Sequence, residues 1–408
     1  MEANWTPVAI AIPIFFLLVG VELLAARLMR RSVYRTGDAL SDLGCGVLQQ
    51  LVGVFARTIL FAGYLAVYGQ FRLAEWSTNS VWTWVVALLG VDLAYYWFHR
   101  TSHGVAVMWA AHVVHHQSED YNLAVALRQG AVQPFFSAWF YLPLALMGIP
   151  PLAFAISSSI NTLYQFWIHT RLVGRLGPLE WVLNTPSHHR VHHGRDPKYI
   201  DRNHAGALIV WDRFFGSFQP EEEEPTYGIT HALDSYDPIR AHFRPYQELW
   251  IRARQAQGWD RLKLWFMPPG WTPEGIEWAP AKPLDAPPFD FPVGPSRAAY
   301  VVAQFAPLVP LTMMLKVFRA GPLDFKLVLA GLMIATLASV AALVEGRTWA
   351  LRFEQLRLLA LPAVSAFLGS FLGSTVAGLA VGGVFGLLSL LWLSATGRGP
   401  APVLRPAS

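Results

Sequence analysis

Histidines gather in three short clusters in the first half of this 408-residue sequence. His99 and His103 are four positions apart, and the other two clusters both read H-x2-H-H, formed by His112, His115 and His116, then by His189, His192 and His193. Residues three or four apart lie on one face of an α-helix, with Cβ atoms about 5–6 Å from each other. Each cluster can therefore direct several imidazole nitrogens toward one point. The spacing predicts a metal centre with nitrogen ligands.

The number of histidines favours two metal ions over one. A zinc ion takes three or four protein ligands, whereas the clusters supply eight histidines, and His169 lies between the second and the third. Cys45 is the one cysteine, so a multi-thiolate site is excluded. Iron is preferred because imidazole suits it and because paired redox ions activate dioxygen, while zinc and manganese stay open alternatives. A zinc peptidase is not expected, since the sequence lacks the motif H-E-x-x-H.

The composition indicates that this centre belongs to a membrane protein. Hydrophobic residues make up 54% of the chain and charged residues 14%, and the mean hydropathy is +0.35. An ordinary soluble domain carries about 25% charged residues. The net charge of +4 is too small and scattered to predict nucleic-acid binding. We therefore expect an all-α integral membrane protein, a multi-span helical bundle whose cytoplasmic, histidine-rich helical cap holds a di-metal site.

Apolar stretches divide the chain into two predicted domains. Spans are expected near residues 8–25, 43–68 and 81–98, followed by a proline-interrupted hairpin over 132–167, with the cap formed by 99–131 and 168–298. Residues 1–298 would form the catalytic domain, and residues 299–408 a histidine-free C-terminal transmembrane bundle, for eight to nine crossings in all. Arginines follow the first span, among them Arg27 and Arg35, and they predict that the C-terminal end of this span faces the cytoplasm. Every histidine cluster is then predicted to face the cytoplasm as well.

Longer strings around the histidines are more specific than the spacing alone. They are DLAYYWFHRTSH (92–103), WAAHVVHHQSEDYNLAVALRQ (109–129), YQFWIHTRLVGRLGPLE (164–180) and NTPSHHRVHHGRDPKYIDRNHAGALIVWDRFFGSF (184–218). Together they resemble the fatty acid hydroxylase and sterol desaturase superfamily of membrane di-iron enzymes, most closely its alkylglycerol monooxygenase branch. The resemblance covers roughly residues 38–220. It implies nine metal ligands, which are His99, His103, His112, His115, His116, His169, His189, His192 and His193, with His188 as a further candidate.

The resemblance also implies a reaction. Two iron ions and dioxygen would hydroxylate a C–H bond of a lipid that enters from the bilayer, at the carbon next to an ether oxygen in the alkylglycerol branch. A sterol, terpenoid or fatty acyl hydroxylase or desaturase is the alternative enzyme. The electrons would come from an external donor, either tetrahydrobiopterin or, as in other branches, cytochrome b5 or ferredoxin. A metal transporter would place ligands and acids near mid-span, and a non-catalytic metal-binding protein is the other non-enzyme alternative.

Polar residues near the clusters have expected supporting roles. Asp92 lies seven residues before His99 and is predicted to accept the second N–H of a ligand histidine, as partners of metal ligands commonly do. Glu119, Asn122, Arg128 and Arg190 are expected to be structural groups around the helices or to contact the substrate headgroup. His204, His231 and His242 lie outside the pattern and are not assigned to the metal. The acidic run at 221–224 is expected to be a solvated loop.

Overall fold

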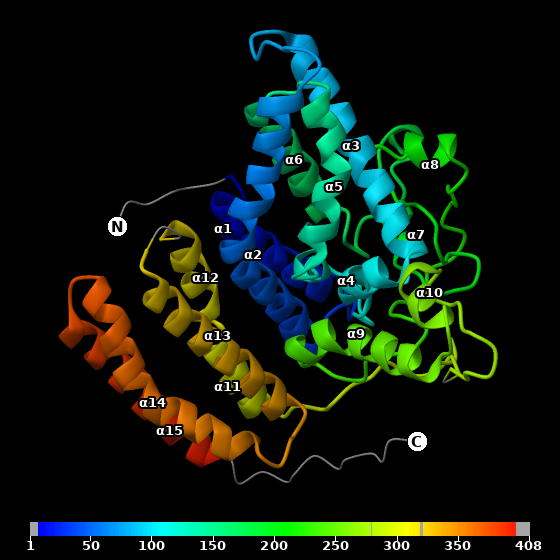
Figure 1. Ribbon diagram of the computed structural model, residues 1–408. Coiled ribbons are helices and arrows are strands. Elements are labelled where there is room, and N and C mark those ends of the chain that lie inside the picture. The colour runs from blue at the N-terminus through cyan, green and yellow to red at the C-terminus, as the bar shows by residue number, and fades with distance from the viewer. Residues whose placement is uncertain (1–6, 279, 319–320, 397–408) are drawn as a thin grey trace.

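The computed structural model describes residues 7–278, 280–318 and 321–396 and is helical throughout, as predicted. Within these ranges the strand pairing amounts to two isolated bridges, Leu183 with Leu208 and Gly194 with Tyr227. Six of the described helical stretches are long and apolar enough to cross a membrane: Ile10–Leu28, Thr36–Ala56, Val81–Gly104, Pro295–Val317, Leu323–Val344 and Thr375–Ala395. The chain is therefore a multi-pass integral membrane protein. Figure 1 shows the N-terminal helices and the C-terminal helices as two neighbouring groups.

The first three helices extend further than the apolar stretches that predict them. They are α1 (Pro7–Leu28), α2 (Thr36–Phe71) and α3 (Val81–Gly104). At 1.5 Å per residue, the 36 residues of α2 measure about 54 Å, well beyond a hydrocarbon core of about 30 Å. Its first turns therefore reach the cap, where Asp38 accepts from the Ser118 hydroxyl at 2.7 Å. The helix α3 also continues past the predicted end of its span, so that His99 and His103 lie on its last turns.

The predicted hairpin is present as α5 (Gln133–Leu146) and α6 (Pro151–Trp167). Pro151 marks the start of α6, because it occupies the first turn, where no backbone N–H is needed for a helical hydrogen bond. Gly148 makes the turn with φ +86°, and a Cβ there would lie 1.8 Å from the Ala74 carbonyl oxygen. Only glycine fits this position. The hairpin returns the chain to the histidines, and α6 packs against α3.

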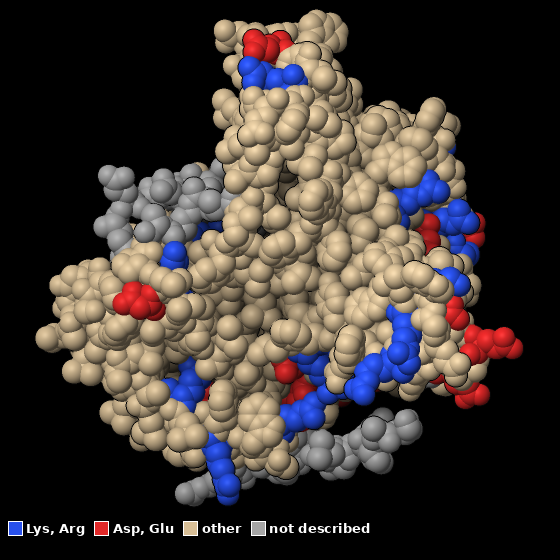
Figure 2. All heavy atoms as spheres, viewed as in Figure 1, with Lys and Arg blue, Asp and Glu red and all other residues tan. Residues whose placement is uncertain are grey.

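The cap consists of short helices joined by long connections. They are α4 (Ala106–His116), α7 (Pro186–His192), α8 (Val210–Phe214), α9 (Pro238–Gln255) and α10 (Asp260–Phe266). Figure 2 shows charged side chains gathered along the lower and right edges of the molecule, over the cap and the lower ends of the C-terminal helices, with smaller clusters at the upper tip and at the left; the surface between them is largely uncharged. This separation is the one expected of a cap that meets water and a bundle that meets lipid.

The C-terminal group differs in part from its prediction. It contains α11 (Pro295–Phe305), α12 (Leu308–Val317), α13 (Leu323–Val344), α14 (Ala350–Phe371) and α15 (Thr375–Thr396). The six candidate spans among the described residues are fewer than the predicted eight to nine, because α5 and α6 are short and α14 carries Arg352, Glu354 and Arg357. The helices α12 and α13 pack against α2. The domain boundary at residue 298 stays a prediction, and residues 397–408 of the second domain lie outside the described ranges.

Candidate metal centre

The histidine clusters converge in the cap, just beyond the end of α3. Helices α3, α4 and α7 carry seven of the nine histidines, His193 directly follows α7, and the turn after α6 carries His169. All nine are buried, and their ring nitrogens form two groups, within each of which one nitrogen per residue lies within 4.8 Å of the others. The five-histidine group is His99, His103, His112, His116 and His192, and the four-histidine group is His115, His169, His189 and His193. The structure thus brings together every histidine that the sequence patterns select.

Local helix geometry explains why the second and third clusters divide between the two groups, whereas His99 and His103 both belong to the five-histidine group. On α4, His112 and His116 are one turn apart and point to the five-histidine group, while His115 is displaced around the helix toward the other group. On α7, His192 contributes to the first group and His189 to the second. Two short helices therefore each supply both groups, and the two groups share the same scaffold.

Hydrogen bonds to carbonyl oxygens fix the tautomer of several rings. A carbonyl oxygen only accepts, so the ring nitrogen that faces it must carry a hydrogen. The Nδ1 atoms of His99, His115 and His169 face the carbonyl oxygens of His204, Arg128 and Gln165 at 2.8, 2.8 and 2.7 Å. In the neutral form, the Nε2 atom of each ring is then left with a lone pair. Ligand histidines in metalloproteins are oriented in this way by a partner on the other nitrogen.

These lone pairs point at one another. The Nε2 atoms of His115 and His169 are 3.2 Å apart, and neither can donate to the other once both Nδ1 atoms carry the hydrogen. In the other group the Nε2 atoms of His99 and His112 are 2.9 Å apart, and Nδ1 of His112 faces the side-chain oxygen of Gln133. Facing lone pairs repel unless a cation lies between them.

The donor set fits such a cation. Metal–imidazole bonds of about 2.0–2.1 Å place neighbouring ligand nitrogens about 3 to 3.4 Å apart, which is close to the separations in both groups. Buried ring nitrogens without a hydrogen-bond partner, among them Nε2 of His103, His192 and His193, are further open ligand positions. The surroundings also keep the rings neutral, because burial lowers the pKa of His112 and of His169 to about 4. A neutral imidazole is the form that binds a metal.

The predicted contact between Asp92 and a ligand histidine is absent, and that prediction is wrong. Asp92 instead accepts from the backbone N–H groups of Ala207 and Leu208 at 2.8 and 3.1 Å and from the indole of Trp211 at 2.9 Å. It also accepts from Asn161 of α6 at 2.5 Å. Two helical turns, about 11 Å, separate Asp92 from His99 along α3, too far for a shared hydrogen bond. Asp92 therefore fixes the loop whose His204 carbonyl orients His99.

The side chains of the other polar candidates hold the cap together and make no hydrogen bond to the nine rings, although the backbone carbonyl of Arg128 faces His115. Glu119 accepts from Lys282 at 2.6 Å and from the Phe289 N–H, and Asn122 donates to the Val33 carbonyl at 2.7 Å. Arg190 pairs with Glu221, with both contacts at 2.7 Å.

Two expectations therefore need correction, for Glu221 and for His188. The side chain of Glu221 is 12% exposed, and its carboxylate pairs with the buried guanidinium of Arg190. The acidic run at 221–224 is therefore not solvated throughout. His188 lies outside both histidine groups, and its ring contacts Phe218 with ring centres 5.4 Å apart. Its place one position off the helix face turns the side chain away from the metal centre.

Several residues of the site have no signal in the sequence. His204 is 2% exposed, its ring centre lies 5.1 Å from that of His103, and neither ring nitrogen has a hydrogen-bond partner. Gln133 of α5 faces Nδ1 of His112 at 2.8 Å, and Asp201 faces Nδ1 of His103 at 3.2 Å. Each of these contacts joins segments that are distant along the chain, so only the fold reveals them.

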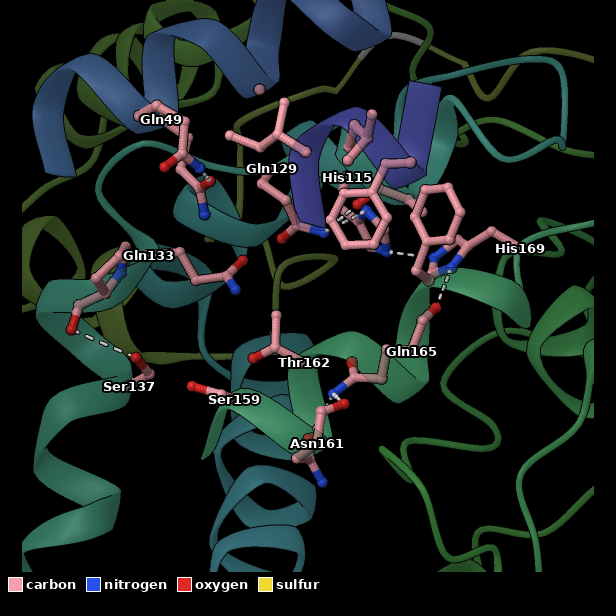
Figure 3. Close-up of a pocket in the computed structure, with 18 of the residues that line it drawn as sticks. Gln49, His115, Gln129, Gln133, Ser137, Ser159, Asn161, Thr162, Gln165 and His169 are labelled. Carbon is pink, nitrogen blue, oxygen red and sulfur yellow. Dashed lines mark hydrogen bonds between the residues drawn. The ribbon is translucent and has the colours of Figure 1, made fainter. Parts of the chain in front are cut away.

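A cavity of about 440 Å³ opens beside the two histidine groups. Its walls come from α1, α2, α3, α5, α6 and α12, so the C-terminal group contributes to it as well. Its lining includes His112, His115 and His169. Figure 3 shows the amide of Gln129 beside His115, and Gln133 faces His112 at 2.8 Å. None of the described residues that line it is Asp, Glu, Lys or Arg. The cavity therefore suits an uncharged molecule with an apolar part and hydrogen-bonding groups.

Comparison with known proteins agrees with this arrangement. The fatty acid hydroxylase family model matches residues 84–217, which contain all nine histidines. Alkylglycerol monooxygenase of Danio rerio is 40% identical over 361 residues, covering 85% of this chain and 79% of that protein. The proteins of the same name from Xenopus tropicalis and Homo sapiens are 46% and 45% identical, and the chain spans 58% and 59% of their lengths. No solved structure matches the chain. The chain belongs to the fatty acid hydroxylase family, in its alkylglycerol monooxygenase branch.

Proposed function

We propose that this protein is a membrane monooxygenase that uses two iron ions and dioxygen to hydroxylate a lipid at the carbon next to an ether oxygen. One observation carries the proposal. His112 belongs to the five-histidine group, His115 and His169 belong to the four-histidine group, and all three line the same cavity. A C–H bond placed beside these three rings faces both proposed metal positions. The names of the relatives supply the substrate class, an alkylglycerol.

The residues around the cavity would bind and orient such a lipid. Phe15, Phe16 and Val47 offer apolar walls for an alkyl chain that enters between membrane helices. The amides of Gln129 and Gln133 lie near the histidines and can hydrogen-bond the hydroxyls of a glycerol headgroup. A charged headgroup is disfavoured, because no charged side chain among the described lining residues would compensate its burial.

The nine histidines would hold the two ions, one in each group. Bound iron supplies the activation of dioxygen, a redox chemistry that no side chain here can provide. The protein orients the ligand rings through the carbonyls of His204, Arg128 and Gln165, and the apolar walls exclude water from the reacting carbon. Hydroxylation next to the ether oxygen gives a hemiacetal, which collapses to a fatty aldehyde and glycerol. We further propose, from the arginines after α1, that the centre faces the cytoplasm.

A deuterated substrate tests the site of hydroxylation. The purified, iron-loaded protein is given a 1-O-alkylglycerol with both hydrogens on the first alkyl carbon replaced by deuterium. Attack at this carbon removes one deuterium, so the fatty aldehyde should retain the other, as measured by mass spectrometry. A fatty alcohol with both deuterium atoms would indicate attack on the glycerol side. An unchanged ether lipid beside a hydroxylated or desaturated fatty acyl or sterol substrate would support the alternative enzyme.

A further inference from the structure

An exposed apolar surface projects from the cap beside α3. It is formed by the short helix η2 (Gly177–Trp181) with the residue that follows it, and by α8 (Val210–Phe214). The two segments are joined at one end, where Leu183 and Leu208 form a bridge. Large apolar side chains exposed together in this way mark a surface that another molecule covers. Four of them define what we call the η2–α8 surface: Leu179, Val182, Trp181 (70% exposed) and Phe214 (80% exposed).

This surface continues the lipid-facing side of the candidate span α3. The ring of Trp97 lies 4.9 Å from that of Phe215, which in turn lies 4.9 Å from that of Phe214. Figure 1 shows α8 beside the middle of α3, in the upper half of the view. Apolar side chains therefore connect the membrane-spanning helix with α8. The exposed residues on that side of α3 include Trp82, Val85, Leu89 and Trp97.

Basic side chains border the apolar residues. The guanidinium of Arg213 lies over the ring of Trp181, 5.5 Å from its centre. Arg100, on the last turns of α3, donates to the Phe215 carbonyl at 3.1 Å. Aromatic rings are enriched where a membrane meets water, and long basic side chains there lie along apolar surface while their charged ends reach the headgroups. The η2–α8 surface has this composition.

The acidic residues of the same segments are directed into the cap. Asp212 is fully buried and accepts from the backbone N–H groups of His204 and Ala205, both at 2.8 Å. Glu180 accepts from the Ser187 hydroxyl at 2.7 Å. The exposed residues of η2 and α8 are otherwise apolar or basic. The surface therefore presents no exposed carboxylate to the phosphate groups of a bilayer.

We propose that the η2–α8 surface lies in the membrane interface, so that part of the cap contacts lipid and not water. The molecule that covers the surface is then phospholipid, with Trp181 and Phe214 among the upper acyl chains and Arg213 near the phosphates. An amphipathic element of this kind enters the boundary between headgroups and acyl chains by about 5–10 Å. This inference does not depend on the reaction that the protein catalyses.

The contact would also set the depth of the metal centre relative to the bilayer. The loop at 205–209 joins α8 to His204, whose carbonyl oxygen faces Nδ1 of His99 at 2.8 Å. Asp92 of α3 holds the same loop by accepting from the N–H group of Ala207 at 2.8 Å. A membrane-contacting α8 is therefore joined by a short, fixed loop to a group that orients a proposed metal ligand.

A fluorescent probe in a bilayer tests this placement. Cys45 is the one cysteine of the chain and is buried, so a cysteine introduced at the surface can be labelled selectively. Phe214→Cys and Trp181→Cys each place a nitrobenzoxadiazole probe in the η2–α8 surface, and either variant alone suffices for the test. Glu223→Cys is the matched control, because its side chain is also exposed, at 68%, but lies in the acidic run of the cap.

Each labelled protein is reconstituted into phosphatidylcholine vesicles that contain a lipid with a nitroxide on its upper acyl chain. This lipid should quench the Phe214→Cys and Trp181→Cys probes several-fold more strongly than the Glu223→Cys probe. The first two should also emit at shorter wavelength, because they lie in an apolar environment.

Two results would overturn the inference. Emission at the long wavelength typical of water, without quenching by the nitroxide lipid, would mean that the surface faces solution. Emission at short wavelength without such quenching would mean that protein covers the surface, for example a second copy of the chain. Both results leave the proposed oxygenase function standing, because the probes report only on the environment of η2 and α8.

Discussion

Two neighbouring histidines of α7 provide a matched test of the metal centre. His189 belongs to the four-histidine group, whereas His188 lies outside both groups, and both side chains are buried at 1% and 3% exposure. Replacement of each by glutamine removes an imidazole from the same helix and keeps a polar side chain of similar length. General destabilisation of α7 should therefore be similar in the two variants, and only one should lose a ligand.

The magnitude follows from the number of ligands. Four-ligand metal sites bind with about 10–16 kcal/mol, so each ligand contributes about 2.5–4 kcal/mol, or on the order of 10²- to 10³-fold in affinity. The five-histidine group keeps all its members in His189→Gln. We therefore expect this variant to retain about half of the iron of the unmodified protein after dialysis against a chelator, and His188→Gln to retain all of it.

Iron content per chain, measured by mass spectrometry, is the assay. Loss of half the iron in both variants would mean that the effect comes from disturbing α7 and not from a lost ligand. Full iron content in His189→Gln would refute the assignment of the four-histidine group, because a site cannot lose one of four nitrogens without weaker binding.

Three further outcomes are expected. Thr162→Trp places an indole in the lipid cavity and should abolish lipid turnover while iron content is unchanged, as measured by aldehyde formation and metal analysis. Gly206→Val should lower both the unfolding temperature and the iron content, because a Cβ at Gly206 would lie 2.9 Å from Oδ1 of Asp92. Val340→Ala, a change in the core far from the histidines, should lower the unfolding temperature without loss of iron. The metal-free protein should lose stability as the pH falls from about 6.5 toward 4. Burial holds the folded-state pKa values of His112 and His169 near 4, so the unfolded chain takes up protons first. Each of the two residues should lower the free energy of unfolding by about 1.4 kcal/mol per pH unit in this range. Chemical denaturation over this pH range measures the slope, and a flat profile would contradict the burial of neutral rings.

The sequence predicts the ligands better than it predicts their surroundings. Helical spacing is a local property, so the positions of His112 and His116 already indicate that their rings share a face. The partners of the rings are set by tertiary contacts, such as the approach of Gln133 on α5 to α4, which no spacing encodes. Asp92 shows the limit most clearly. Its burial in an apolar helix is a sound reason to expect an important role, but only the folded chain reveals that it holds the loop at 205–211.

The protein with two iron ions per chain provides the most direct test of the account. It is reconstituted in lipid with a 1-O-alkylglycerol and tetrahydrobiopterin, and dioxygen consumption is followed together with fatty aldehyde release. Our account predicts one aldehyde for each dioxygen consumed, and no aldehyde from protein stripped of iron or kept free of dioxygen. Aldehyde release that continues without iron or without dioxygen would contradict the assignment of this centre as an oxygen-activating site.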